Sequence, residues 1–486
     1  MKRLLPTLAL LLASAAGCAR EGDADAGFAQ QGLLTRSFDL AGSTTKTDLG
    51  QQVLVDELGR YLVVGYVSPG SVGLARFLPD GSIDTSYGAG GSGRIAYSAP
   101  LQVVTAATRD AVGRIVVVGF GQKSGGAPSD YDGVVCRYTA AGQRDISLGS
   151  SGCRSYSLDH VGGGGDFFSA VTTDGAGQIY VAGQTQVSAE DYDFVVMKLA
   201  SPDALPLSTF AGTGDVTIGF DIQANHAGGD VDGATAILLL NNALYVGGYA
   251  VDDLGTDLAL AKLSALNGAL DGAFCPDSTT CSGSQRLGGL RTIGLNLGGD
   301  NDERVRALAA TPDGRIVVAG EVQRDVAGNV SNNYLVTRLN SNGSYAAPFG
   351  SGTAIYNSIL PGLSLTGLAV RSDGRIVIGG DTAGTPTAPD PQRVLWAVQL
   401  SAAGVPDGQF ASGLGGASSI ALFTFPNAGA GQPLDHRGGG ISLDRGRILL
   451  AGARLWRQDL PNGVQDFDFA AVRMQGDAIF SDGLEF

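Results

Sequence analysis

The stretch Pro312-Asp313-Gly314-Arg315-Ile316-Val317-Val318-Ala319-Gly320 reads as a tight turn followed by a β-branched strand that ends on glycine. Segments of this kind recur about every 64 residues along the chain of 486 residues. The seven copies are residues 59–65, 113–119, 177–183, 242–247, 314–320, 374–379 and 446–452. Self-similarity at this spacing predicts a repeat architecture in which each copy contributes one small β-unit.

A second mark of the repeat is a basic residue near the end of the next predicted strand. Six of the seven copies have this residue: Arg76, Arg137, Lys198, Lys262, Arg338 and Arg473. The sixth copy along the chain is the exception and carries Gln399 at this position. Because this residue recurs, we predict a structural role, in which it pairs with an aspartate of its own or a neighbouring repeat.

Four short strands with generous loops fit the repeat length, and helical periodicity is almost absent over residues 32–476. We therefore predict an all-β fold, a seven-bladed β-propeller of four-stranded blades. The last repeat stops after its third strand, residues 469–474, whereas residues 32–38 resemble a fourth strand such as residues 93–97. An N-terminal strand that completes the last blade would close the ring and cover two sheet edges.

Two segments carry a resemblance to a known family, Pro79–Gly88 (PDGSIDTSYG) and Pro312–Gly320 (PDGRIVVAG). In these segments the chain resembles the delta-60 repeat family of bacterial secreted proteins, over about residues 32–476. The resemblance implies a β-propeller and supplies no catalytic residues to carry over.

The composition excludes some functions. There are 32 Lys and Arg against 47 Asp and Glu, so the formal net charge is −15. Neither nucleic acid nor an anionic membrane surface has an electrostatic reason to bind such a chain. Glycine is abundant at 75 residues, but a hydrophobic content of 44% can fill a large core.

The N-terminus resembles an export signal, because Lys2 and Arg3 precede the apolar run 4–16. Cys18 follows small residues as in a bacterial lipobox, so residues 1–17 are predicted to be a lipoprotein-type signal peptide, with Cys18 lipidated. Cleavage after Ala15 is the alternative. Residues 18–31 are predicted to be a flexible tether and residues 477–486 a C-terminal tail of unassigned role. We expect an exported monomer, on the outer membrane, in the periplasm or secreted, that meets the membrane only through the lipid.

Without Cys18 the chain holds an even set of cysteines, which suits an oxidising compartment. Cys275 and Cys281 close a short loop, and Cys136 and Cys153 lie on predicted neighbouring strands. We predict disulfides among these four, and a Cys-x5-Cys metal site is the alternative.

Acidic residues and all three histidines gather in loops that a propeller would place on one face. The candidate ligand-binding residues are His160, Asp166, His226, Asp300, Asp302, Asp435 and His436. Asp230 and Asp232 depart from the repeat pattern and are candidate calcium ligands, because Ca²⁺ prefers oxygen donors. Calcium is the suggested cofactor. The three histidines could instead bind a transition metal, or they could simply hydrogen-bond a loop.

A structural interpretation competes with this one. Four aspartates stand five residues before the basic residue of their repeat, as strand- or turn-capping positions would: Asp132, Asp193, Asp257 and Asp468.

Three functions remain open. The first is a non-catalytic scaffold that binds a protein, a small molecule or a glycan through an acidic loop face. The second is a metal-assisted hydrolase or lactonase-like enzyme with its site in the central funnel. The third is a purely structural surface protein.

Overall fold

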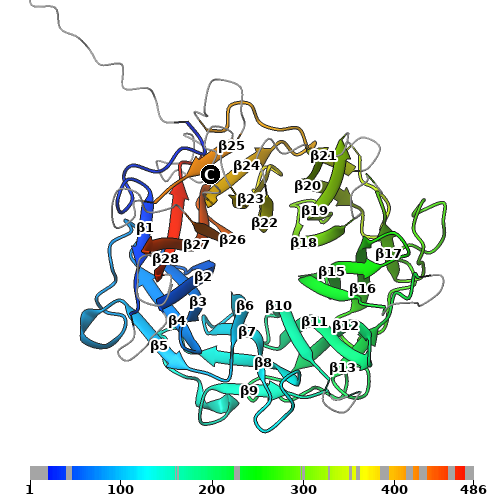
Figure 1. Cartoon of the computed structure of the whole chain (residues 1–486), viewed down its shortest axis with the longest axis horizontal. Coiled ribbons are helices and arrows are strands. Elements are labelled where there is room, and N and C mark those ends of the chain that lie inside the picture. Colours follow the sequence, from blue (N-terminus) through cyan, green and yellow to red (C-terminus); the bar gives the residue numbers. More distant parts are fainter. Residues whose placement is uncertain are drawn as a thin grey trace, which may run out of the picture.

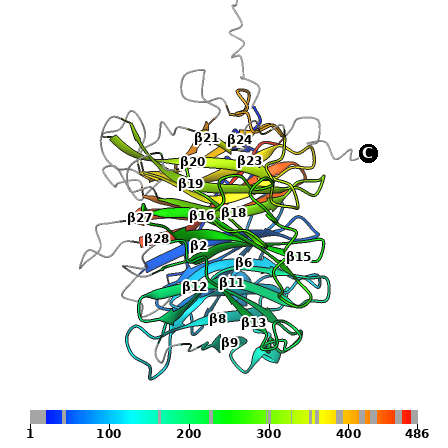
Figure 2. The same ribbon diagram turned by 90° about the vertical axis from the view of Figure 1, so that its right-hand side faces the viewer.

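The computed structural model describes residues 20–39, 46–158, 160, 164–223, 230–295, 297, 302–326, 329–347, 349, 353–356, 362–383, 393–411, 420–425, 435–457 and 466–476. These residues form β-strands and two short 3-10 helices, η1 (Ala89–Gly91) and η2 (Ile146–Leu148). The strands make sheets arranged around a central axis (Figure 1). Figure 2 shows the same ring from the side. The fold is an all-β propeller.

Five sheets have four antiparallel strands each, in chain order from the axis outward. They are β6 (Val103–Arg109), β7 (Ile115–Gln122), β8 (Tyr131–Tyr138) and β9 (Cys153–Tyr156); β10 (Asp166–Thr173), β11 (Ile179–Ser188), β12 (Asp191–Leu199) and β13 (Asp215–Ile218); β14 (Gly233–Leu240), β15 (Ala243–Val251), β16 (Thr256–Ser264) and β17 (Leu290–Ile293); β18 (Glu303–Ala310), β19 (Ile316–Val326), β20 (Asn329–Leu339) and β21 (Thr353–Tyr356); and β22 (Leu363–Val370), β23 (Ile376–Ala383), β24 (Arg393–Leu400) and β25 (Ile420–Phe423).

The remaining strands form one eight-stranded sheet from the first and last repeats. Its strands are β1 (Leu33–Arg36), β2 (Lys46–Val55), β3 (Tyr61–Val67), β4 (Ser71–Phe77), β5 (Arg94–Ser98), β26 (His436–Asp444), β27 (Arg447–Arg457) and β28 (Asp466–Met474). The prediction of a seven-bladed propeller of four-stranded blades is therefore wrong: in the described part of the chain, five four-stranded blades stand alone. The physical reason is a short parallel pairing of β2 with β28, Lys46 beside Asp466 and Thr47 beside Phe467, which joins the two repeats.

The predicted closure of the ring by an N-terminal strand is confirmed. Strand β1 pairs antiparallel with β28, with Leu33 opposite Val472 and Arg36 opposite Phe469, and the two lie side by side in Figure 1. The last strand of the chain thus receives its partner from the first, and its backbone groups are satisfied without a free edge.

The segment before β1 is not a flexible tether in its described part, residues 20–31. Phe28 is fully buried and packs edge-on against Tyr61. The buried carboxylate of Asp25 lies 2.8 Å from a guanidinium nitrogen of Arg473. The small, polar composition of residues 18–31 predicted a tether. The packing of Phe28 against Tyr61 and the ion pair of Asp25 with Arg473 instead hold the described part of the segment against the propeller.

The second strand of each repeat is buried on both faces, because every sheet lies between two others. In β19, Ile316, Val317 and Val318 are at most 1% exposed. This explains the continuous apolar runs of the repeat. The turn before the strand is built by its polar residues: Asp110 accepts the backbone N–H of Arg114 at 2.8 Å and binds its side chain at 2.6 Å.

The basic residue of the third strand joins neighbouring repeats. Each donates to a backbone carbonyl of the next repeat around the ring: Arg76 to Ala140, Arg137 to Pro202, Lys198 to Ala265, Lys262 to Ser341, Arg338 to Ala402 and Arg473 to Pro79. The predicted aspartate partner is confirmed in three repeats, as Arg76 with Asp84, Arg137 with Asp145 and Lys262 with Asp271.

Where the sixth repeat carries Gln399, the N-terminal segment takes over this role. Glu21 accepts from Gln399 at 3.3 Å and forms ion pairs with Arg371 and Arg375. Residues 20–36 thus connect the sixth repeat to the eight-stranded sheet.

The predicted disulfides are confirmed. Cys136 on β8 is bonded to Cys153 on β9, and Cys275 is bonded to Cys281 within a loop. All four residues are buried, and a metal site at these cysteines is thereby ruled out.

Candidate functional site

Of the predicted ligand-binding and metal residues, Asp166, Asp232 and His436 are buried and accept backbone N–H groups of nearby loops. Asp166 accepts the N–H of Leu158 at 2.7 Å and the hydroxyl of Thr185 at 2.6 Å. Asp232 accepts the N–H of Phe220 at 2.6 Å. The arrangement leaves these side chains at most 2% exposed, so they are not open to a ligand.

His436 has the same role at the start of β26. Its Nε2 accepts the N–H of Phe425 at 3.0 Å, and the ring is fully buried. Burial, assisted by the nearby Arg454, lowers the pKa of His436 to about 4, so the imidazole is neutral at physiological pH. Asp48 with Phe38 and Glu303 with Leu295 repeat the arrangement. The shared feature is an acceptor at or near the start of an innermost strand, which clamps the chain arriving from the previous repeat.

The other predicted residues do not form a common site. Asp435 pairs with Arg437 at 3.2 Å, and Asp302 lies 3.7 Å from Arg304. His160 is exposed and its Nε2 lies 3.5 Å from the hydroxyl of Thr217. His226, Asp300 and Cys18 lie outside the described residues, as do the predicted signal peptide and C-terminal tail. Within the described part of the chain, no three Asp, Glu, His or Cys side chains are grouped so that they could hold a metal ion.

The predicted calcium residues Asp230 and Asp232 belong to an acidic cluster together with Asp193 and Asp221. The backbone of Tyr192 binds both Asp230 and Asp232, which brings the ends of β12 and β14 together. Burial raises the pKa of Asp232 to about 8 and that of Asp193 to about 7, and the neighbouring carboxylates act in the same direction. The cluster therefore holds protons near neutral pH.

These shifts predict that the protein loses stability as the pH rises. An aspartate in the unfolded chain titrates near 3.9, so between that pH and about 8 the folded state binds more protons at Asp232 than the unfolded state does. The free energy of unfolding therefore falls as the pH rises through this range. Asp232→Asn, which keeps an oxygen for Phe220, is expected to stabilise by about 1 kcal/mol or more at pH 8 and to change little at pH 4. Urea unfolding at both values checks this, and equal effects at both would contradict it.

A larger and more open feature is the central cavity, of about 460 Å³. Its described lining comes from every innermost strand: Gln51, Gln52, Thr105, Ala106, Ala107, Thr108, Ser169, Ala170, Val171, Thr235, Ala236, Ile237, Arg306, Ala307, Leu308, Leu365, Thr366, Gly439 and Gly440. The volume lies within the range of roughly 300–1,000 Å³ that is usual for small-molecule sites, and the mixture of apolar surface with a few polar groups is also typical of them.

A β-bulge in each innermost strand places polar residues on this cavity. The extra residues are Gln51, Thr105, Ser169, Thr235, Arg306 and Thr366, with Gly439 and Gly440 in β26. Three hydroxyls cross to the next repeat, from Thr105 to the carbonyl of Phe168, Thr235 to Val305 and Thr366 to Gly439. The sequence analysis missed these residues, because their common position appears only when the repeats are aligned at the bulge.

Some polar lining groups are not used by the fold. Within the described part of the chain, the side chains of Gln51, Thr108 and Ser169 form no hydrogen bond. Of the described lining residues, none is Asp, Glu, His or Cys. The cavity thus offers hydrogen-bonding groups to a ligand without a candidate acid or base.

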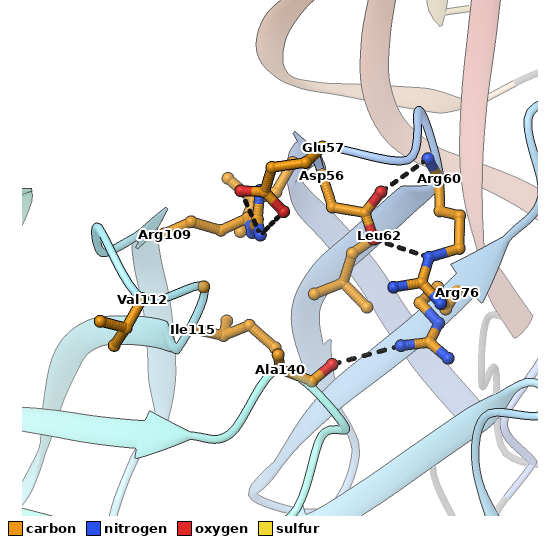
Figure 3. Close-up of a pocket in the computed structure, with 11 residues that line it drawn as sticks. Asp56, Glu57, Arg60, Leu62, Arg76, Arg109, Val112, Ile115 and Ala140 are labelled. Atoms are coloured by element: carbon orange, nitrogen blue, oxygen red, sulfur yellow. Dashed lines mark hydrogen bonds and ion pairs between the residues drawn. The ribbon is translucent and has the colours of Figure 1, made fainter.

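A second pocket, of about 100 Å³, lies between the first two repeats (Figure 3). Its charged groups face one another: Arg60 binds Asp56 at 2.7 Å, and Arg109 binds Glu57 at 3.0 Å. Arg76 donates to Ala140 across the same seam. The pocket is too small for a typical ligand. Of its two ion pairs, Arg60 with Asp56 lies within the first repeat, and Arg109 with Glu57 joins the second repeat to the first.

Two segments of the chain, residues 59–87 and 311–344, match the family described as "Domain of unknown function (DUF5122) beta-propeller". The match supports a propeller-repeat family, and the more specific delta-60 resemblance stays a prediction. None of the curated proteins matches the sequence.

Several solved structures are similar to this chain at low identity. Polysaccharide lyase Uly1 is 12% identical over 94% of this chain and 97% of that chain, with a TM-score of 0.46. The Nup133 β-propeller domain of Vanderwaltozyma polyspora is 10% identical over 90% and 97%, with a TM-score of 0.41. A thermostable family-43 glycoside hydrolase is 11% identical over 65% and 90%, with a TM-score of 0.29. Likenesses this weak carry no information about activity.

Proposed function

We propose that this protein is an exported, non-catalytic binding scaffold that holds a small, hydroxyl-rich molecule of the sugar class in its central cavity. The observation that carries the proposal is the set of unused polar groups on Gln51, Thr108 and Ser169 in a cavity of about 460 Å³. Hydroxyl and amide groups both donate and accept, so they match sugar hydroxyls. The neighbouring alanines and valine supply apolar surface for the ring of the ligand.

This proposal moves the binding site away from the acidic loop face. Asp166, Asp232 and His436 are occupied by backbone N–H groups, and they cannot turn to a ligand without releasing the loops that they hold. A hydrolase in the central funnel would need an acid, a base or a metal ligand among the lining residues. The lining described above supplies none of these, which supports binding over catalysis.

Export is supported by two disulfides, which are typical of oxidising compartments. Among the described residues there is no helix with the length and apolar character needed to cross a membrane. Lipidation of Cys18 remains part of the proposal, and loss of labelled-palmitate incorporation in Cys18→Ala would support it.

Saturation-transfer NMR with four probes tests the proposed site: D-glucose, D-galactose, D-glucuronate and D-galacturonate. Ser169→Trp fills the cavity from β10, and Ser155→Trp adds the same side chain at an exposed position of β9. We expect at least one probe to bind the wild type and Ser155→Trp, and its signal to be lost in Ser169→Trp. Absence of binding by all four probes, or binding that survives Ser169→Trp, would contradict the proposed function.

A further inference from the structure

Arg306 departs from the pattern of the cavity. At the bulge of each innermost strand the other repeats place neutral side chains, Gln51, Thr105, Ser169, Thr235 and Thr366, or glycine. In β18 the same position carries a cation. Among the described lining residues Arg306 is the only charged one, in a chain whose formal net charge is −15.

The guanidinium is held by a fixed partner. Nη2 of Arg306 lies 2.7 Å from Oε2 of Glu321 on β19. The other oxygen of Glu321 accepts the backbone N–H of Leu365 at 2.7 Å, which ties the carboxylate to the next repeat. These contacts hold the side chains of Arg306 and Glu321 in place before a ligand binds. Ligand binding therefore costs little additional side-chain conformational entropy.

The corresponding acid of the sixth repeat shows that this arrangement is not a requirement of the fold. Asp381 also accepts an N–H from the next repeat, that of Gly438 at 2.8 Å. Its cationic partner is Arg393, which comes from β24 and is not among the residues that line the cavity. Of these two repeats, only the fifth places the arginine that pairs with its acid on the cavity, as Arg306.

The guanidinium retains donors for a ligand. Arginine has five N–H donors in a planar fork, and the bond to Glu321 uses only one Nη2 donor. Nε is buried and has no hydrogen-bond partner, so the donors that remain for a ligand are those of Nη1 and the second donor of Nη2. A ligand carboxylate accepts two parallel N–H bonds from such a fork, with charge assistance that a neutral hydroxyl does not provide.

We propose that Arg306 recognises the carboxylate of the ligand, so that the molecule held in the central cavity is a sugar acid of the hexuronate type. This inference rests on the proposed function and specifies its ligand class. The hydroxyls of the sugar then meet Gln51, Thr108 and Ser169, and the acidic group meets Arg306 with Glu321 as its positioning residue.

Calorimetric titration with D-glucuronate and D-glucose, which differ only at C6, tests the inference. The wild type is expected to bind glucuronate at least tenfold more tightly than glucose. Arg306→Thr, which installs the residue of three other repeats, is expected to remove this preference. Arg306→Lys keeps the charge without the fork, and an intermediate affinity is expected.

Arg304→Thr is the matched control, because Arg304 lies on the same strand, contacts Asp302 and Tyr249, and does not line the cavity. Its affinity for glucuronate is expected to stay within twofold of the wild type. If glucose and glucuronate bind equally and Arg306→Thr and Arg306→Lys change nothing, the inference fails while the cavity site stands. If no sugar binds in a way that Ser169→Trp blocks, the proposed function itself fails.

Discussion

Deletion of residues 20–38 is expected to abolish the closed ring. The deletion removes the pairing of β1 with β28 and three buried apolar side chains, Phe28, Leu34 and Phe38. Truncation of one buried Leu or Phe typically costs about 2–5 kcal/mol, and the three together reach the total stability of a typical protein, about 5–15 kcal/mol. The exposed edge of β28 would also be free to pair with other chains.

Size-exclusion chromatography and thermal unfolding measure this effect. A chain that starts at Arg20 keeps every described contact and is the control, expected to run as a monomer with a cooperative transition. The chain that starts at Asp39 is expected to aggregate or to lose that transition. A monomer with an unchanged midpoint would show that the N-terminal segment is dispensable for closure.

Arg473→Met is expected to cost about 3–5 kcal/mol, the usual cost of removing one partner of a buried ion pair. Arg473 is 4% exposed, and its guanidinium lies 2.8 Å from Asp25, 3.0 Å from the hydroxyl of Tyr61 and over the ring of Phe28. Methionine keeps much of the volume but leaves the carboxylate of Asp25 buried with weaker partners.

Denaturant unfolding of Arg473→Met is best compared with Lys46→Met. Lys46 pairs with Asp39 at 3.0 Å, but both side chains are about two-fifths exposed, so that loss is expected to be below about 1 kcal/mol. Asp25→Asn combined with Arg473→Met should be less destabilising than the sum of the two single changes, because they share one interaction. Equal losses in Arg473→Met and Lys46→Met would show that the pair does not clamp the ring.

Much of the fold could be predicted from the sequence, because each repeat carries its own local signals. The turn glycines, the apolar second strands and the recurring basic residue lie where the structure has them, and the strand missing from the last repeat indicated the closure by β1. The merged eight-stranded sheet could not be predicted, since it depends on two residue pairs between β2 and β28 that no periodicity marks.

The candidate site was harder to predict, because sequence does not show which polar residues are buried. Asp166, Asp232 and His436 look like exposed loop residues beside glycines, yet they are acceptors for the backbone of the preceding repeat. The cavity residues have no motif at all. Arg306 stands out only when the repeats are aligned at the bulge, a feature of strand register that the structure reveals.

Methyl NMR of the threonine-labelled protein, titrated with D-glucuronate, tests most directly whether the ligand site is the central cavity. Thr105, Thr235 and Thr366 line the cavity, whereas Thr185 and Thr256 bind the acidic residues Asp166 and Asp302. We expect chemical-shift changes at the three cavity threonines and none at the other two. Changes confined to Thr185 and Thr256 would place binding at the acidic loops and contradict the account.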